Sequence, residues 1–129
     1  PISESTSSSA DALHAARELA LHTGAAVLVT GRTDYSTDGR QVTATENGHA
    51  MMSRVTGVGC SMGALSAACA AVSPTPLQAA VSTAVLMGIA GEMAFEQSPF
   101  PGSFAVSLLD SLYALSPEDV VRRARFLSL

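Results

Sequence analysis

Two long helix-forming stretches, Cys60 to Val72 and Leu77 to Gln97, are apolar on nearly every side. A helix on the surface of a single domain normally keeps one polar face. Pro74 and Pro76 separate the stretches, and only a few short strand-like segments precede them. The small sheet that those segments predict cannot cover such helices. We therefore expect them to be buried against another chain or against a further half of the same fold.

The composition bounds the class of protein. A chain of 129 residues, 47% of them apolar, suits one domain with a core. The formal net charge is −4 and every basic residue is arginine, without a basic stripe, which argues against nucleic-acid binding. The start, Pro1 to Ser9, is polar rather than signal-like, and no uninterrupted apolar run predicts a membrane span. Removal of a leading methionine and a cut inside a longer chain both explain the initial proline.

The two cysteines, Cys60 and Cys69, lie nine residues apart on one predicted helix. At about 100° per residue they face opposite sides, roughly 13 Å apart along the axis. A disulfide needs Cα atoms within about 7 Å, so we expect free thiols, which suit a reducing cytosol.

The first part of the chain predicts an α/β unit. Helical spacing runs from Ala10 to His22, with Gly24 as the stop, and the continuous apolar run Ala25 to Val29 is typical of a strand buried on both faces. Thr30 and Gly31 follow at the strand's carboxyl end, where ligands bind in open α/β sheets.

Shorter elements follow. Asp34 to Gly39 is rich in turn residues, with Asp38-Gly39 as a hairpin turn. Gln41 to Glu46 and Ala50 to Val55 read as strands on either side of a second turn at Asn47-Gly48. The first long helix carries one apolar band, formed by Met62, Leu65, Ala68, Cys69 and Val72, and the second has a possible weak point at Gly88 or Gly91. A loop is predicted from Pro99 to Gly102 and a third helix from Ser103 to Leu115. A last helix begins after Ser116, with Pro117 at its first position.

The turn Gly57-Val58-Gly59-Cys60 opens directly onto the first long helix. Backbone N–H groups and the helix dipole at such a place attract anions, and the same field favours a thiolate at Cys60. The plainer alternatives are a tight turn without a ligand and a small buried thiol. Cys69 fits the second alternative better, since Cys60 lies at the helix start. Phosphate binding beside an activated side chain suggests phosphoryl transfer.

Other polar residues carry weaker signals. Thr30 can bind phosphate or cap a turn, and Asp34 with Asp38 can be a metal pair or, more simply, solvated turn residues. The histidines (His14, His22, His49) show no ligand spacing, so we predict no metal site. The arginines near the end (Arg122, Arg123, Arg125) are interpreted as a solvated face.

Together these segments resemble hydroxyethylthiazole kinase, a family of thiamin-salvage enzymes in the ribokinase-like superfamily. The matching pieces, in order, are Thr30-Gly31, Asp34, Asp38-Gly39, Asn47-Gly48-His49, Met52, Val55 to Cys60, Gly88 to Glu92, Pro101 to Phe104 and Leu108 to Asp110. Most of the superfamily carries aspartate where Cys60 stands, which makes the match specific. Arg32 departs from the glutamate usual in the family, which affects only local electrostatics.

The resemblance covers nearly the whole chain, yet family members are about twice as long. It therefore implies that residues 1–129 form the C-terminal half of one ribokinase-like three-layer α/β/α domain, a few strands packed with several apolar helices. The absent N-terminal half, as a separate or cleaved chain, would supply much of the thiazole pocket, an ATP-contacting arginine and the acidic residues near Mg²⁺.

The resemblance further implies a cytoplasmic enzyme that phosphorylates the hydroxyl of 4-methyl-5-(2-hydroxyethyl)thiazole with ATP and forms homotrimers. Cys60 would be the catalytic base or orienting acceptor, and Cys60 with Gly57 would bind the substrate. ATP phosphates would be held by Thr30 and Thr56 and by the backbone of Gly57, Val58 and Gly59. The alternative function is a non-catalytic oligomeric module that binds a nucleotide or anion.

Overall fold

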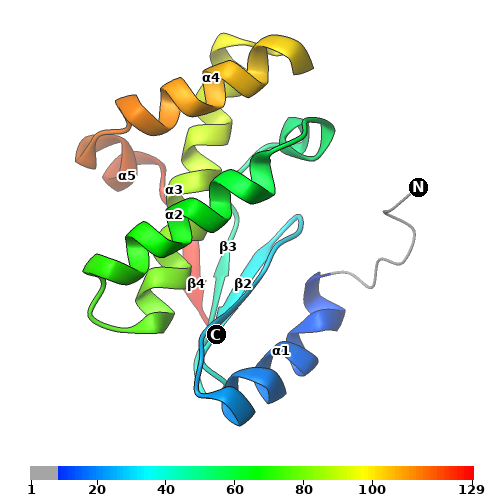
Figure 1. The fold of residues 1–129 in the computed structure, drawn as a ribbon, viewed down its shortest axis with the longest axis vertical. Coiled ribbons are helices and arrows are strands. Elements are labelled where there is room, and N and C mark those ends of the chain that lie inside the picture. Colours follow the sequence, from blue (N-terminus) through cyan, green and yellow to red (C-terminus); the bar gives the residue numbers. More distant parts are fainter. Residues whose placement is uncertain (1–8) are drawn as a thin grey trace.

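A computed structural model describes residues 9–129 (Figure 1). The polar start, Pro1 to Ser9, therefore lies almost wholly outside the described residues. The elements in chain order are α1 (Ser9–Thr23), β1 (Val27–Val29), β2 (Asp34–Thr37), β3 (Val42–Thr45), the 3-10 helix η1 (Ala50–Arg54), α2 (Val58–Val72), α3 (Pro76–Gln97), α4 (Pro101–Ala114), α5 (Pro117–Arg123) and β4 (Phe126–Ser128).

The described strands form one sheet in the order β1-β2-β3-β4, and every neighbouring pair is antiparallel. Helix α1 packs against β1 and β2, whereas α3 crosses β1, β2 and β3 (Figure 1). Helices α2 and α4 pack on α3 and form a further helical layer. This mixture of helices and a small sheet agrees with the predicted α/β class.

The first helix and its end were predicted well. Helix α1 runs to Thr23, and Gly24 adopts a positive φ of 72° while its N–H bonds to the carbonyl of Ala20 at 2.8 Å. The prediction of a strand buried on both faces was wrong. Strand β1 begins only at Val27, and its side chains are half-buried because it is the edge strand of the described sheet.

The stretch after β1 is a strand where a turn was expected. Residues Asp34 to Thr37 form β2, and Asp34 is buried rather than solvated. The hairpin turn itself is confirmed: the Asp38 carboxylate accepts from the N–H groups of Arg40 and Gln41, at 2.9 and 2.8 Å. These two bonds lower the pKa of Asp38. Turn chemistry was therefore correctly recognised but assigned to too many residues.

The expected strand from Ala50 to Val55 is instead the 3-10 helix η1. The His49 side chain starts this helix, because its Nδ1 accepts from the N–H of Met51 at 3.0 Å. Met51 and Met52 both pack against the apolar core. In a strand, adjacent side chains point to opposite faces, so Met51 and Met52 could not both pack against one core there, which explains why the prediction failed.

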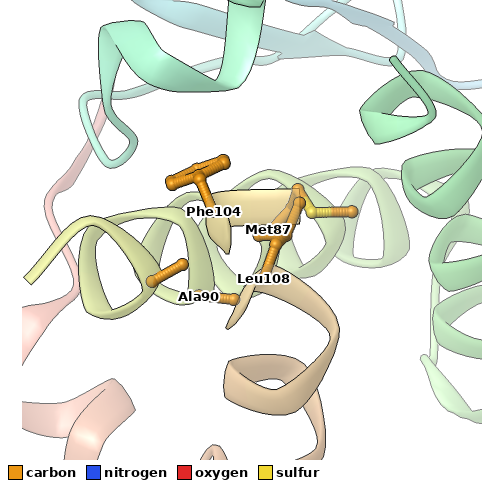
Figure 2. Packing of buried hydrophobic residues seen from close by; sticks show 5 residues of the cluster. Met87, Ala90, Phe104 and Leu108 are labelled. Atoms are coloured by element: carbon orange, nitrogen blue, oxygen red, sulfur yellow. The ribbon is translucent and has the colours of Figure 1, made fainter. Parts of the chain in front are cut away.

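Helix α3 lies at the centre of the core. Its Met87, Ala90 and Ala94 pack with Phe104 and Leu108 of α4 (Figure 2). By length and composition α3 could cross a membrane, but 56% of its most apolar window is buried inside the protein, as expected of a core helix.

The apolar band predicted on α2 is only partly correct. Cys69 is buried, and Met62 and Leu65 pack against the core from half-buried positions. Ala68 and Val72 are exposed. Helix α2 packs on α3 along one side, so residues turned away from α3 remain uncovered by the described chain.

Three helix boundaries complete the fold. The expected weak point at Gly88 or Gly91 was wrong, since α3 is continuous from Pro76 to Gln97. Helix α4 begins at Pro101, because proline fits the first turn of a helix, so the expected loop is shorter. Helix α5 begins as predicted, with a capping box in which Ser116 and Asp119 bond each other's backbone.

Candidate functional site

A cavity of about 880 Å³ lies where the ends of β1 and β3 meet the start of α2. Its lining combines polar loop residues with apolar side chains of η1 and α2. The residues are Thr30, Gly31, Arg32, Asp34, Asn47, Gly48, His49, Ala50, Met52, Ser53, Val55, Gly57, Val58, Gly59, Met62 and Gly88. The walls therefore come from two stretches of the chain, residues 30–34 and 47–62, together with Gly88 of α3.

The first wall is the start of α2. Gly57 is its N-cap residue and adopts φ 98°, ψ −11°, a left-handed conformation that glycine adopts readily. No side chain caps this helix end. A Cβ placed on Gly57 or Gly59 would meet nothing within 4 Å. The first turn of this 15-residue helix therefore lines the cavity without a side-chain cap from Gly57, and helix starts of this kind attract anions.

The second wall is the end of β1 with the following turn. The Gly31 N–H donates to Oδ1 of Asp34 at 2.8 Å, which ties the turn to β2. Burial raises the pKa of the Asp34 carboxyl, and the bond from Gly31 offsets part of that rise. Thr30 is exposed at this wall and available to a ligand.

The third wall, Asn47 to His49, is firmly attached to α3. The Gly48 N–H and the Asn47 Nδ2 both donate to Oε1 of Glu92, at 2.9 and 3.1 Å. The His49 ring stacks on Phe95 with centroids 3.6 Å apart and an interplanar angle of 17°. Both aromatic contact and hydrogen bonds therefore hold this wall.

The predicted site residues divide into two groups. Thr30, Gly57, Val58 and Gly59 line the cavity. Thr56 and Cys60 are exposed but do not belong to its lining. The thiol of Cys60 thus lies next to the cavity in sequence and open to solvent, whereas Cys69 is the buried one, as expected from their spacing.

Several lining residues were not among the predicted site residues. Asp34, Asn47 and His49 belonged to the family-matching motifs, Asp34 also to a possible metal pair, and Arg32 was noted only as a departure from the family. The adjacent turn signal Asn47-Gly48 pointed to a loop here, but nothing in it showed that the loop would meet α2 across a cavity.

The interpretation of the late arginines as a solvated face was wrong for Arg123, whose side chain is 22% exposed, and Arg125 is exposed but forms an ion pair. Arg123 makes a double hydrogen bond to Glu96, at 2.7 and 3.1 Å, which lowers the pKa of that carboxyl. Arg125 bonds to Glu92 at 2.6 Å. The side chains of Arg122 and Arg125 are 69% and 52% exposed, and Arg122 is paired with Asp119 on its own helix. The acidic partners lie on α3, which pattern reading could not foresee.

Comparison with known proteins assigns the chain to a family. A model of the hydroxyethylthiazole kinase family matches residues 3–118. The chain belongs to this family. It is 99% identical over 126 residues to hydroxyethylthiazole kinase from Akkermansia muciniphila, and 53% identical over 112 residues to the one from Granulibacter bethesdensis. These matches cover 98% and 87% of this chain.

A solved member of the family has the same fold. The structure of a hydroxyethylthiazole kinase protein from Pyrococcus horikoshii OT3 superposes with a TM-score of 0.87 at 39% identity, over 92% of this chain. The chain covers only 46% of that structure, and 46% and 41% of the Akkermansia and Granulibacter proteins. It thus spans about half the length of the relatives it matches. Family membership favours the kinase over a non-catalytic binding module.

Proposed function

We propose that this chain is the C-terminal half of an enzyme that transfers the γ-phosphoryl group of ATP to the primary hydroxyl of 4-methyl-5-(2-hydroxyethyl)thiazole. The observation that carries the proposal is the uncapped start of α2, which opens onto a cavity of about 880 Å³. Membership of the hydroxyethylthiazole kinase family supplies the reaction.

The residues of the cavity suit phosphate. Phosphoryl transfer depends on positioning and on stabilising charge at the equatorial oxygens. The N–H groups of Val58, Gly59 and Cys60 would provide that stabilisation, since no side chain occupies them. Thr30 and Thr56 would hydrogen-bond the phosphate chain. Gly57 and Gly59 carry no side chain that would hold a phosphate away from the backbone.

In the proposed step, the hydroxyl oxygen of the thiazole alcohol attacks the γ-phosphorus. A new oxygen–phosphorus bond forms as the bond to the bridging oxygen breaks, and ADP leaves with that electron pair. The hydroxyl proton passes to the Cys60 sulfur as general base. Cys60 with Gly57 would bind the substrate at this end of α2.

Magnesium is the metal expected with ATP, but the described residues do not assemble a site for it. No group of three or more His, Cys, Asp or Glu side chains converges among residues 9–129. Among the described residues, Asp34 is the only carboxylate that lines the cavity, and its Oδ1 already accepts from the Gly31 N–H. We therefore assign the magnesium ligands to the N-terminal half and derive no step through the metal.

The remaining parts of the proposal concern assembly. We propose that the N-terminal half completes the site, that complete subunits form a homotrimer, and that the enzyme works in the cytoplasm. Large apolar side chains left exposed on α4 and β4, such as Val106, Tyr113 and Leu127, agree with burial against further protein.

The test is reconstitution. The chain, alone and together with the remaining half of the enzyme, is mixed with ATP, Mg²⁺ and the thiazole alcohol, and ADP formation is followed. Intact mass shows which polypeptides are present. We expect activity only when both halves are present, whether joined or separate. A complete, folded enzyme that leaves the thiazole alcohol unphosphorylated would contradict the proposal.

A further inference from the structure

We propose that Glu92 is a positioning residue that fixes the Asn47-Gly48-His49 wall and thereby sets the affinity of the cavity for the nucleotide. This inference rests on the proposed function. Glu92 lies toward the C-terminal end of α3, outside the cavity lining, and no site role was predicted for it from the sequence.

One carboxylate oxygen of Glu92 gathers three donors. Its Oε1 accepts from the Asn47 Nδ2 at 3.1 Å, the Gly48 N–H at 2.9 Å and the Arg125 Nη2 at 2.6 Å. The Glu92 side chain is only 14% exposed. Charge-assisted bonds to a carboxylate are stronger than neutral ones, so the loop is held by more than ordinary turn contacts.

Asn47 also bonds the segment between α5 and β4. Its Nδ2 also donates to the carbonyl of Arg123 at 2.9 Å, and its Oδ1 accepts from the Arg125 N–H at 2.8 Å. Both ends of the buried amide are therefore engaged, which fixes its orientation. Arg125 additionally donates to the carbonyl of Glu46 at 3.0 Å. The wall is thus bonded to α3 and to the connection between α5 and β4.

Close packing removes the remaining freedom. A Cβ added to Gly88 would lie 2.6 Å from the Asn47 Cβ and 2.7 Å from its carbonyl carbon, so backbone and helix touch. Gly48 has φ +121°, a conformation that side chains rarely adopt. One helical turn beyond Gly88, Glu92 receives the Gly48 N–H, and Phe95 receives the His49 ring. Successive turns of α3 therefore hold successive residues of the wall.

The hydrogen bonds and ion pair around Glu92 are not an efficient way to gain folding stability. Bringing the carboxylate of Glu92 into a largely buried place carries a desolvation cost that apolar packing would avoid. What Glu92 provides is position: it holds the Gly48 N–H, and Gly48 and its neighbour His49 both line the cavity. These residues share the cavity with Thr30, Val58 and Gly59, which are proposed to hold the ATP phosphates, whereas Cys60, the proposed base, does not line it. Loss of Glu92 should therefore affect nucleotide binding.

The test compares two carboxylates one turn apart on α3, in the full-length enzyme. Glu92→Gln removes the charge at the wall. Glu96→Gln removes the charge that pairs with the Arg123 guanidinium. Among the described residues these two side chains hydrogen-bond only each other, and neither residue lines the cavity, so this variant serves as the control. We expect Glu92→Gln to raise KM for ATP about tenfold with kcat within threefold, a moderate effect for a shifted binding wall. Glu96→Gln should leave both constants within twofold of the parent enzyme.

A second pair of variants covers the case in which Glu92→Gln fails to fold. Arg125 is half exposed, so Arg125→Met removes one donor from the network at lower risk. It should raise KM for ATP, and Arg125→Lys, which keeps the charge, should restore most of the affinity. Equal KM values in the folded Glu92 and Glu96 variants, or in Arg125→Met and the parent, would overturn the inference, as would a loss confined to kcat. A parent enzyme inactive on the thiazole alcohol would instead overturn the proposed function.

Discussion

Two walls of the same cavity use glycine in opposite ways. At the wall formed by Asn47 to His49, glycine serves contact: Gly88 lies against Asn47, and Gly91 lies against the Met52 side chain, closer than any Cβ would allow. At the start of α2, Gly57 and Gly59 have nothing within 4 Å of where a Cβ would stand. We call the wall at Asn47 to His49, which is packed against α3, the closed wall, and the start of α2 at Gly57 to Cys60 the open wall.

The difference separates a scaffold from a binding surface. A glycine that lets two backbones meet is needed for that contact, because any added side-chain atom would overpack a site that has no free space. Glycines facing empty space next to uncapped N–H groups leave room for a ligand atom near the backbone. A substitution at the closed wall should therefore change stability, and one at the open wall should change activity.

The largest expected effect lies at the open wall. Cys60→Ala in the full-length enzyme should lower the rate of thiazole phosphorylation by at least ~100-fold, the usual scale for losing a positioned acid–base group. Cys60→Asp should retain or raise the rate, because a carboxylate can take the same proton. Initial rates of ADP formation measure both. Cys69→Ala, nine residues along the same helix, is the control and should keep the rate. Full activity in Cys60→Ala would remove the assignment of the base.

The next effect lies at the closed wall. Gly88→Ala should destabilise the protein by about 1–3 kcal/mol, because the new methyl group would collide with the Asn47 backbone. Urea denaturation of the full-length enzyme measures the change. Gly63→Ala is the matched control: Gly63 lies within α2 with nothing within 4 Å, and alanine should stabilise that helix by about 0.5–1 kcal/mol. Equal stability of the two variants would erase the distinction between the walls.

A third variant separates stability from binding at one position. Gly59→Ala meets no neighbour, so the midpoint of urea denaturation should stay the same or rise. The methyl group would nevertheless stand where the phosphate approaches, and we expect KM for ATP to rise about tenfold, or ~1.4 kcal/mol. A fall in stability without a change in KM would show that this turn is packed rather than open.

The smallest effect concerns Asp34, which ties Gly31 to β2. Burial raises its pKa in the folded protein, so the folded state holds this proton more tightly than the unfolded chain. Asp34 therefore costs stability as pH rises from the ordinary carboxyl range through the raised pKa. Asp34→Asn keeps an acceptor for Gly31 and should remove that part of the pH dependence. The melting temperatures of parent and variant, measured from pH 3 to pH 8 in steps of roughly 1 pH unit, test this prediction. A parallel pH profile would show that Asp34 is not the cause.

Local rules predicted a good part of the fold. The helix ending at Gly24, the Asp38-Gly39 turn and the Ser116 cap all depend on a residue and its near neighbours, and the structure confirms each. The turn at Gly57, left-handed at the start of α2, belongs to the same class. Family membership, predicted from ordered motifs, is confirmed as well.

Elements that depend on distant contacts escaped prediction. Residues 50–54 were predicted as part of a strand because nothing in their own sequence shows that Met51 and Met52 both pack against the core, as they do in the 3-10 helix. Arg125 looked solvated because its partners, Glu92 and the carbonyl of Glu46, are 33 and 79 residues away along the chain. The short β4 likewise depends on pairing with β3.

By itself the sequence determined the groups at the start of the apolar helix α2: Thr56, the glycine turn that follows it and the thiol of Cys60, all of them neighbours in the chain. Only the tertiary structure decided which of them meet. It brought the Asn47 to His49 loop across from that helix, kept Thr56 and Cys60 out of the lining, and recruited Glu92 to hold the wall. The physical reason is that hydrogen-bond partners and packing distances between segments far apart in the chain are set by the arrangement of the whole core.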